Sequence, residues 1–122
     1  MSLRLPKAAR LGRAGEFDRV KREGASYAGR YFVLAVLRGL PEDELPRIGL
    51  ITSRRVGDSV TRHRVRRRLR ELFRVARPLV KRGLWLVLIA RAAAARASFA
   101  ATQEEWRALG AKAGIFLQEV AG

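Results

Sequence analysis

One basic segment decides how this chain folds. Residues 56–74 read VGDSVTRHRVRRRLRELFR. On a helix of about 100° per residue, the apolar side chains of this segment and the next two residues form one stripe of normal width: Val65, Leu69, Leu72, Phe73 and Ala76. The opposite side carries what we call the arginine ridge: His63, Arg66, Arg67, Arg70, Arg74 and Arg77. The segment therefore predicts a helix that packs one face on a core and presents basic side chains on the other.

Like charges follow one another along this helix. Solvated helix faces usually mix charges, because like charges four residues apart destabilise a helix by a few tenths of a kcal/mol per pair. Four such pairs occur here: Arg62/Arg66, Arg64/Arg68, Arg66/Arg70 and Arg70/Arg74. Guanidinium groups hold phosphate through two hydrogen bonds at once and stack on bases. The pattern favours an anionic partner over a plain solvated surface.

The overall charge leads to the same class of partner. The 122 residues carry 26 Lys+Arg against 11 Asp+Glu, a net charge of +15, and residues 47–96 alone hold fifteen basic and two acidic side chains. Nucleic acid is the first candidate partner, and an anionic membrane or another acidic surface is the second. Cysteine is absent, which excludes a disulfide framework, a thiolate metal site and a cysteine nucleophile. The single histidine, His63, argues against a histidine-built zinc site or a Ser-His-Asp triad.

Weaker patterns outline the rest of a single domain. A short helix over 16–22 is stopped by Gly24, and apolar runs predict strands at 31–37, 47–53 and 84–89. Asp58 or Ser59 caps the basic helix, which runs to about Arg77. Ser98 caps a last helix whose apolar positions are Phe99, Thr102, Trp106, Leu109, Ala113, Phe116 and Val120. No apolar run approaches the roughly twenty residues of a membrane helix, and the start lacks a secretory signal, so we expect a cytoplasmic protein with no membrane partner.

At the basic helix the sequence resembles the bacterial ribonuclease P protein family. The family signature is a basic pair, a glycine and then Arg-Asn-Arg at the start of a basic helix. Here these positions are Arg54-Arg55, Gly57 and Arg62-His63-Arg64. The resemblance covers about residues 5 to 110 and includes Leu5-Pro6, Arg10-Leu11, Phe17, Val20, Gly24 and the strands around 30–34, 47–50 and 89–91. At the middle position this sequence has His63 where the family has asparagine. Histidine lacks the paired donor and acceptor of an amide.

This resemblance implies a fold and a function. The fold would be an α+β domain spanning residues 1–122, an α-β-β-β-α-β-α sandwich whose basic helix lies in a left-handed crossover, although the general rule favours a right-handed one. The function would be that of the protein subunit of ribonuclease P, an endoribonuclease that removes the 5′ leader from precursor tRNA. In that enzyme the RNA subunit is the catalyst and Mg²⁺ is held mainly by the RNA, so the protein supplies no catalytic residue and no metal ligand.

The resemblance also implies two RNA-binding surfaces. The catalytic RNA would contact Arg54, Arg55, Arg62, His63, Arg64, Arg66, Arg67 and Arg70. The leader of precursor tRNA would lie in a cleft lined by Phe17, Lys21, Tyr31, Val33 and Ala35. The residues support the second surface in part, since Tyr31, Val33, Ala35 and Leu37 alternate along one strand and share a face, and an aromatic ring beside them can stack on a base. Packing in the core is the alternative role for Phe17.

Two other classes of function fit the same charge. A ribosomal protein shares the small size and the RNA partner, but its binding would not depend on the length of a tRNA leader. A DNA-binding regulator would recognise duplex sequence and dimerise, although the basic segment lacks helix-turn-helix spacing. Leader length therefore separates the leading interpretation from both alternatives.

Overall fold

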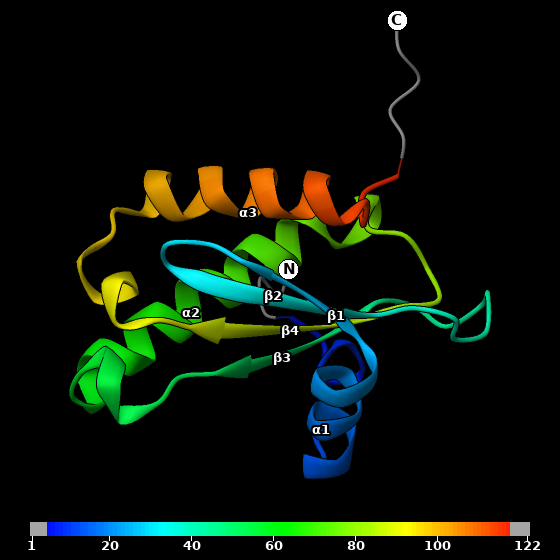
Figure 1. The fold of residues 1–122 in the computed structure, drawn as a ribbon, viewed down its shortest axis with the longest axis horizontal. Helices are drawn as coiled ribbons and strands as arrows, with labels where there is room; N and C mark the ends of the chain where they lie inside the picture. The colour runs from blue at the N-terminus through cyan, green and yellow to red at the C-terminus, as the bar shows by residue number, and fades with distance from the viewer. Residues whose placement is uncertain (1–4, 118–122) are drawn as a thin grey trace, which may run out of the picture.

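The computed structural model describes residues 5–117, and its main elements follow the expected order α-β-β-β-α-β-α (Figure 1). The helices and strands are α1 (Ala14–Glu23), β1 (Ala25–Ala28), β2 (Phe32–Leu37), β3 (Arg47–Ile51), α2 (Ser59–Ala76), β4 (Trp85–Ala90) and α3 (Phe99–Ala113). Short 3₁₀ turns join them at η1 (Lys7–Ala9), η2 (Arg54–Val56), η3 (Arg77–Leu79) and η4 (Ala92–Arg96). The α+β fold class is confirmed.

The four strands form one sheet in the order β1-β2-β4-β3. Antiparallel pairing joins β1 to β2 and β2 to β4, whereas β3 and β4 run parallel. Parallel neighbours need a crossover connection, and α2 provides it, because it lies between β3 and β4 in the chain. The arginine-rich helix is therefore the crossover helix, as expected. The left-handed sense of this crossover stays a prediction.

Each face of the sheet supports its own core. Along β2, the side chains of Phe32, Leu34 and Val36 pack with α2 and α3, whereas Ala35 and Leu37 pack with α1 on the other face. The predicted apolar stripe of α2 is confirmed: Val65, Leu69, Leu72 and Phe73 are all buried in the first of these cores. The side of α2 opposite this buried stripe, which carries the arginines, therefore faces away from the core.

The two long helices begin at the predicted caps. The Asp58 carboxylate accepts the backbone N–H of Thr61 at 2.8 Å, and the Ser98 hydroxyl accepts that of Ala101 at 3.0 Å. The end of the last helix was predicted wrongly. Gly114 adopts a left-handed conformation (φ 69°) and stops α3 at Ala113, which is a common helix terminus.

Phe116 lies beyond that helix end. It forms an antiparallel bridge with Val80 and packs edge-on against the ring of Trp106. Its spacing matched the helix period, yet its burial comes from an extended segment. Val120, the last residue of the predicted helical pattern, lies outside the described residues.

The residue pattern alone missed strand β1. Its four residues are mostly exposed and small, so neither alternation nor an apolar run marks them. Gly24, immediately before it, was expected to end α1 and does so. Its φ of −88° is ordinary, and the reason for glycine is space: a Cβ atom there would lie 2.4 Å from the carbonyl oxygen of Val20 and 2.5 Å from that of Val36.

A carboxylate from α3 holds the turn between β1 and β2. Glu105 accepts three successive backbone N–H groups, from Arg30 at 2.6 Å, Tyr31 at 2.9 Å and Phe32 at 3.0 Å. Gly29 completes the fit, because a Cβ atom on it would lie 2.5 Å from the Glu105 carboxyl carbon. One side chain of the last helix therefore fixes a turn about 75 residues earlier in the chain.

We expect Glu105→Ala to lower the free energy of unfolding by about 2 kcal/mol, because the three N–H groups lose a charged acceptor. Glu104→Ala removes the same charge from an exposed neighbour on α3 and should change stability by less than about 0.5 kcal/mol. Urea unfolding of both variants measures the difference. Equal midpoints would show that the carboxylate contributes nothing to the turn.

Candidate nucleic-acid interface

The outer surface of α2 carries most of the predicted RNA-binding residues. His63, Arg64 and Arg67 are exposed, and Arg62, Arg66 and Arg70 are half-buried. Arg54 and Arg55 lie exposed on η2, just before the helix. Local helix geometry explains this arrangement, since the apolar stripe turns these positions outward.

The basic side chains divide between two flanks of the helix. On the flank near η4, Arg64 donates to the carbonyl of Ala95 at 2.7 Å, and Arg68 donates to that of Ala97 at 3.0 Å. On the flank near β3, Arg66 donates to the hydroxyl of Thr52 at 2.7 Å. Arg64 is therefore turned away from Arg66, as the helical period predicts, although the resemblance grouped the two as contacts of the catalytic RNA.

Three arginines gather on the flank near β3. Burial lowers the pKa of Arg70, and the positive charges of Arg10 and Arg66 lower it further. We call Arg10, Arg66 and Arg70 the three-arginine cluster. The sequence did not assign Arg10 to this surface, because tertiary contacts bring the N-terminal segment here: Arg10 bridges to Ile48 of β3, and Arg47 donates to the carbonyl of Arg10 at 2.8 Å. Like charges held this close repel one another unless an anion lies among them.

Acidic side chains neutralise little of α2. Within residues 5–117, the only ion pair made by an arginine of this helix joins Arg74 to Glu71, at 2.6 Å. The hydrogen bond between them lowers the pKa of Glu71 and raises that of Arg74. Arg77, just after the helix, donates instead to the carbonyl of Pro46, and burial lowers its pKa. Most of the arginine ridge therefore keeps its charge available for a partner.

A second surface lies on the sheet face that α1 covers only in part. The ring of Phe17 packs directly on Gly49, where a Cβ atom would lie 2.4 Å from its Cε2. Beyond this ring, Val33, Ile89 and Ile51 pair across three strands and stay half-buried. We call these three residues the open row of the sheet. Ile51 and Ile89 were not predicted, because only strand pairing places them beside Val33.

Two of the predicted leader contacts do not fit this surface. Ala35 is 1% exposed and packs under α1 with Val20, so its side chain is closed to a ligand. Tyr31 precedes β2 and packs against the core on the opposite face. Tyr31 and Val33 do not share a sheet face as predicted. The N–H groups of three successive residues all donate to Glu105, whereas those of an extended strand point alternately to opposite sides. Lys21 is exposed on α1, as a leader contact requires.

An ion pair sets the position of α1 on the sheet. The Glu16 carboxylate accepts the N–H groups of Gly12 and Arg13 and pairs with Arg47 of β3 at 2.9 Å. Burial disfavours the charged carboxylate, but these hydrogen bonds and the Arg47 charge outweigh it and lower the pKa of Glu16. Because Phe17 is the next residue, this pair also fixes the ring above Gly49.

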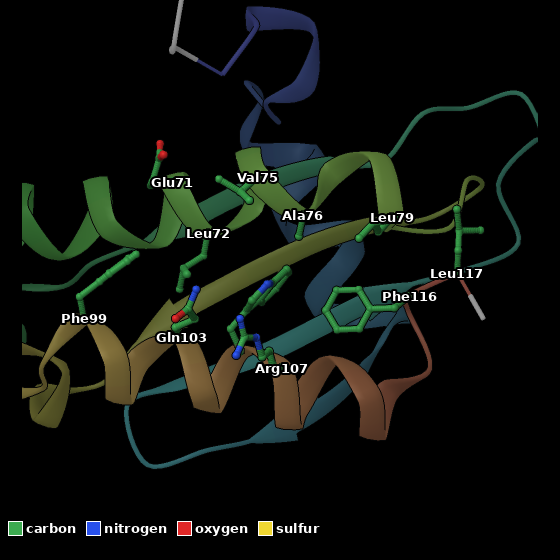
Figure 2. Close-up of a pocket in the computed structure, with 11 residues that line it drawn as sticks. Glu71, Leu72, Val75, Ala76, Leu79, Phe99, Gln103, Arg107, Phe116 and Leu117 are labelled. Carbon is green, nitrogen blue, oxygen red and sulfur yellow. The ribbon is translucent and has the colours of Figure 1, made fainter. Parts of the chain in front are cut away.

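An apolar groove of about 510 Å³ runs between α2 and α3. Figure 2 shows Leu72 and Ala76 of α2 facing the side chains of α3, while the carboxylate of Glu71 points away from them. Phe99 and Phe116 line the groove as well. Its apolar lining differs from the arginine-rich flank near β3, so we do not include it in the nucleic-acid interface.

The described part of the chain offers no metal cluster and no membrane-spanning helix. Between residues 5 and 117 there is no group of three or more His, Cys, Asp or Glu side chains that could hold a metal ion. Within the same range, no helix is both long enough and apolar enough to cross a membrane.

Comparison with known proteins shows the family of the chain. The family model described as Ribonuclease P matches residues 5–114. The chain belongs to the ribonuclease P protein family. Relatives named "Ribonuclease P protein component" include one from Natranaerobius thermophilus, 38% identical over 105 residues, which covers 86% of this chain and 90% of the relative. Another, from Clostridium acetobutylicum, is 34% identical over 113 residues; the match covers 93% of this chain and 95% of the relative.

Solved structures of ribonuclease P proteins share the fold. The Staphylococcus aureus protein superposes with a TM-score of 0.82 at 27% identity, covering 90% of this chain and 99% of that one. The Thermotoga maritima protein, solved with 1-(4-fluorophenyl)-2-thiourea, superposes with a TM-score of 0.69 at 26% identity. The match covers 77% of this chain and 90% of that one. The ribonuclease P family therefore accounts for both the sequence and the architecture. The chain is a protein subunit of this endoribonuclease of tRNA 5′ maturation, whose catalytic part is RNA.

Glu16→Gln tests how firmly α1 is held. At pH 7 this change should lower the free energy of unfolding by about 1 kcal/mol, because a charged acceptor is lost. The pKa of Glu16 is lower in the folded chain than its usual 4.5. The stabilisation is therefore complete above pH 4.5 and disappears as the pH falls through the lowered pKa. Urea titrations across this pH range should show the two proteins converging in acid.

The control for this experiment is Glu23→Gln, which removes a more exposed carboxylate from the same helix. It should change stability at pH 7 by less than about 0.5 kcal/mol. A Glu16→Gln difference that persists unchanged in acid would contradict the role of the ion pair.

Proposed function

We propose that the flank of α2 near β3 binds the catalytic RNA subunit of ribonuclease P. The three-arginine cluster carries this proposal: Arg66 reaches Thr52, Arg10 is bridged to Ile48 of β3, and the positive charges of both act on Arg70 with no carboxylate to offset them. Arg67 and His63 extend the charge along the exposed side of the helix. Phosphate groups of a folded RNA supply the negative charge that this surface lacks. Arg54 and Arg55 extend the same surface at the start of α2.

The leader of precursor tRNA binds, in this proposal, beside α1. Phe17 offers an aromatic ring held on Gly49, and the open row of Val33, Ile89 and Ile51 offers an apolar floor next to it. Exposed Lys21 adds a positive charge on the same helix. A ring and a flat apolar strip next to positive charge suit an unpaired strand, whose bases stack and whose phosphates pair with cations.

The chemistry of cleavage belongs to the RNA in this proposal. Mg²⁺ held mainly by the RNA subunit supplies the activated water, and this chain acts as one RNA-binding domain in the cytoplasm. Its contribution is positional: it raises substrate affinity through the leader and screens repulsion between phosphates. The demand for Mg²⁺ falls as a result.

Replacing the ridge arginines tests the first surface. We expect Arg66→Ala/Arg67→Ala/Arg70→Ala to weaken binding to a bacterial catalytic RNA by at least about tenfold and to reduce the salt dependence of the affinity by about two units. Arg82→Ala/Arg107→Ala/Lys112→Ala removes the same charge from exposed sites elsewhere and serves as the control. A large drop in melting temperature with intact RNA affinity would reverse the assignment.

Leader length tests the second surface. With the catalytic RNA present, extending the 5′ leader of a precursor tRNA from one to about five nucleotides should raise affinity. Phe17→Leu keeps apolar packing on Gly49 but removes the ring, so it should reduce that gain about fivefold or more. Phe99→Leu, at a half-buried ring in the α2–α3 groove, is the control. Affinity that ignores leader length would favour a ribosomal or other RNA-binding role.

A further inference from the structure

A basic pocket lies at one end of the sheet, next to the start of α2, and shares Arg55 with the proposed surface for the catalytic RNA. The parallel strands β3 and β4 end side by side, and the chain continues into η2 and η4, which contact one another at the left end of the sheet in Figure 1. With the β1–β2 turn they enclose a pocket of about 560 Å³, which we call the end pocket. Crevices at the carboxyl ends of parallel strands are frequent ligand sites, and this volume is typical of them.

Three arginines from three segments line the end pocket. Arg30 comes from the β1–β2 turn, Arg55 from η2 and Arg96 from η4, and all three are exposed. Their guanidinium groups make no ion pair or hydrogen bond to any residue from 5 to 117, and none of the pocket residues is acidic. Three like charges around one hollow are stable only with an anion between them or water screening them.

The remaining walls of the pocket are aromatic and small. Tyr31 lies under the guanidinium of Arg30, with 5.6 Å between that group and the ring centroid. Alanine side chains of η4 form most of the opposite wall and leave room for a flat group. Stacked ring and guanidinium surfaces beside free cations are the groups that bind an unpaired base and its phosphate.

The pocket is built before any ligand arrives. Glu105 fixes the turn that carries Arg30 and Tyr31 through its three backbone hydrogen bonds. Arg91 secures the same turn by donating to the carbonyl of Gly29 at 2.9 Å. A preformed site loses less conformational entropy when a ligand binds. The hydrogen bonds from Glu105 and Arg91 thus hold an exposed turn in one conformation.

We propose that the end pocket binds a single unpaired nucleotide of an RNA strand, with its phosphate between Arg30, Arg55 and Arg96 and its base beside Tyr31. This inference rests on the proposed function for the identity of the partner as RNA. It adds a third contact surface, on the face of the sheet opposite Phe17, because Tyr31 packs with the core of α2 and α3.

Nuclear magnetic resonance of the isotope-labelled full chain tests the pocket directly, with adenosine 5′-monophosphate as the probe. The backbone amides of residues 92–97 and of the β1–β2 turn should shift saturably. Adenosine alone and inorganic phosphate alone should bind several-fold more weakly, because each lacks half of the recognised group. Arg30→Ala/Arg96→Ala should abolish the shifts, and Tyr31→Leu, which keeps apolar packing, should weaken them. Shifts that survive in the double variant, or that occur only along α2, overturn the proposal.

The assembled enzyme provides the second test. Arg30→Ala/Arg96→Ala should weaken affinity for the catalytic RNA or for precursor tRNA by about tenfold, whereas Arg82→Ala/Arg107→Ala, with the same loss of charge, should leave both affinities unchanged. If the pocket variant matches this control while Arg66→Ala/Arg67→Ala/Arg70→Ala loses RNA affinity, the pocket inference is wrong and the proposed function stands. If the ridge variant also keeps full affinity, the proposed function itself fails.

Discussion

The structure depends on the burial of one side of α2. Val65, Leu69, Leu72 and Phe73 are almost completely removed from water, and burial of such side chains contributes roughly 1.5–3 kcal/mol each. Repulsion between neighbouring arginines costs only a few tenths of a kcal/mol per pair. The apolar side therefore outweighs the charged side, so the helix can concentrate positive charge without ion pairs along most of its length. A helix can carry such a charged surface only where burial of its other side contributes more free energy than the repulsion costs.

The sheet distributes the basic groups around the molecule. Because β3 and β4 are parallel neighbours, the chain leaves both strands at the same end, where η2 and η4 meet. The start of α2 is fixed there, and the helix then runs back along the core. Arg10 approaches from the N-terminal segment through its bridge to Ile48. Side chains from distant parts of the sequence thus contribute to the same electrostatic surface.

Local patterns predicted what depends on local physics. The period of α2, its Asp58 cap and the apolar run of β2 follow from neighbouring residues, and all were confirmed. The resemblance added the exposed strand β1, which has no pattern of its own. Tyr31 was misplaced because a carboxylate from α3 bends the chain before β2, and Arg10 was missed because tertiary pairing alone brings it to Arg70. The arginine ridge was predictable as a helix face, and the helical period already places Arg64 and Arg68 outside it, but the hydrogen-bond partners of the arginines, such as Thr52 and Ala95, depend on tertiary packing.

The strand order has a consequence for synthesis on the ribosome. Since β4 lies between β2 and β3, β3 cannot join the rest of the sheet until residues 85–90 have emerged, although Arg10 can already bridge to Ile48. The turn at Arg30 waits longer still for Glu105. Domains generally fold as units during translation. The cationic helix therefore leaves the exit tunnel before β4 and α3 are available to cover its apolar side.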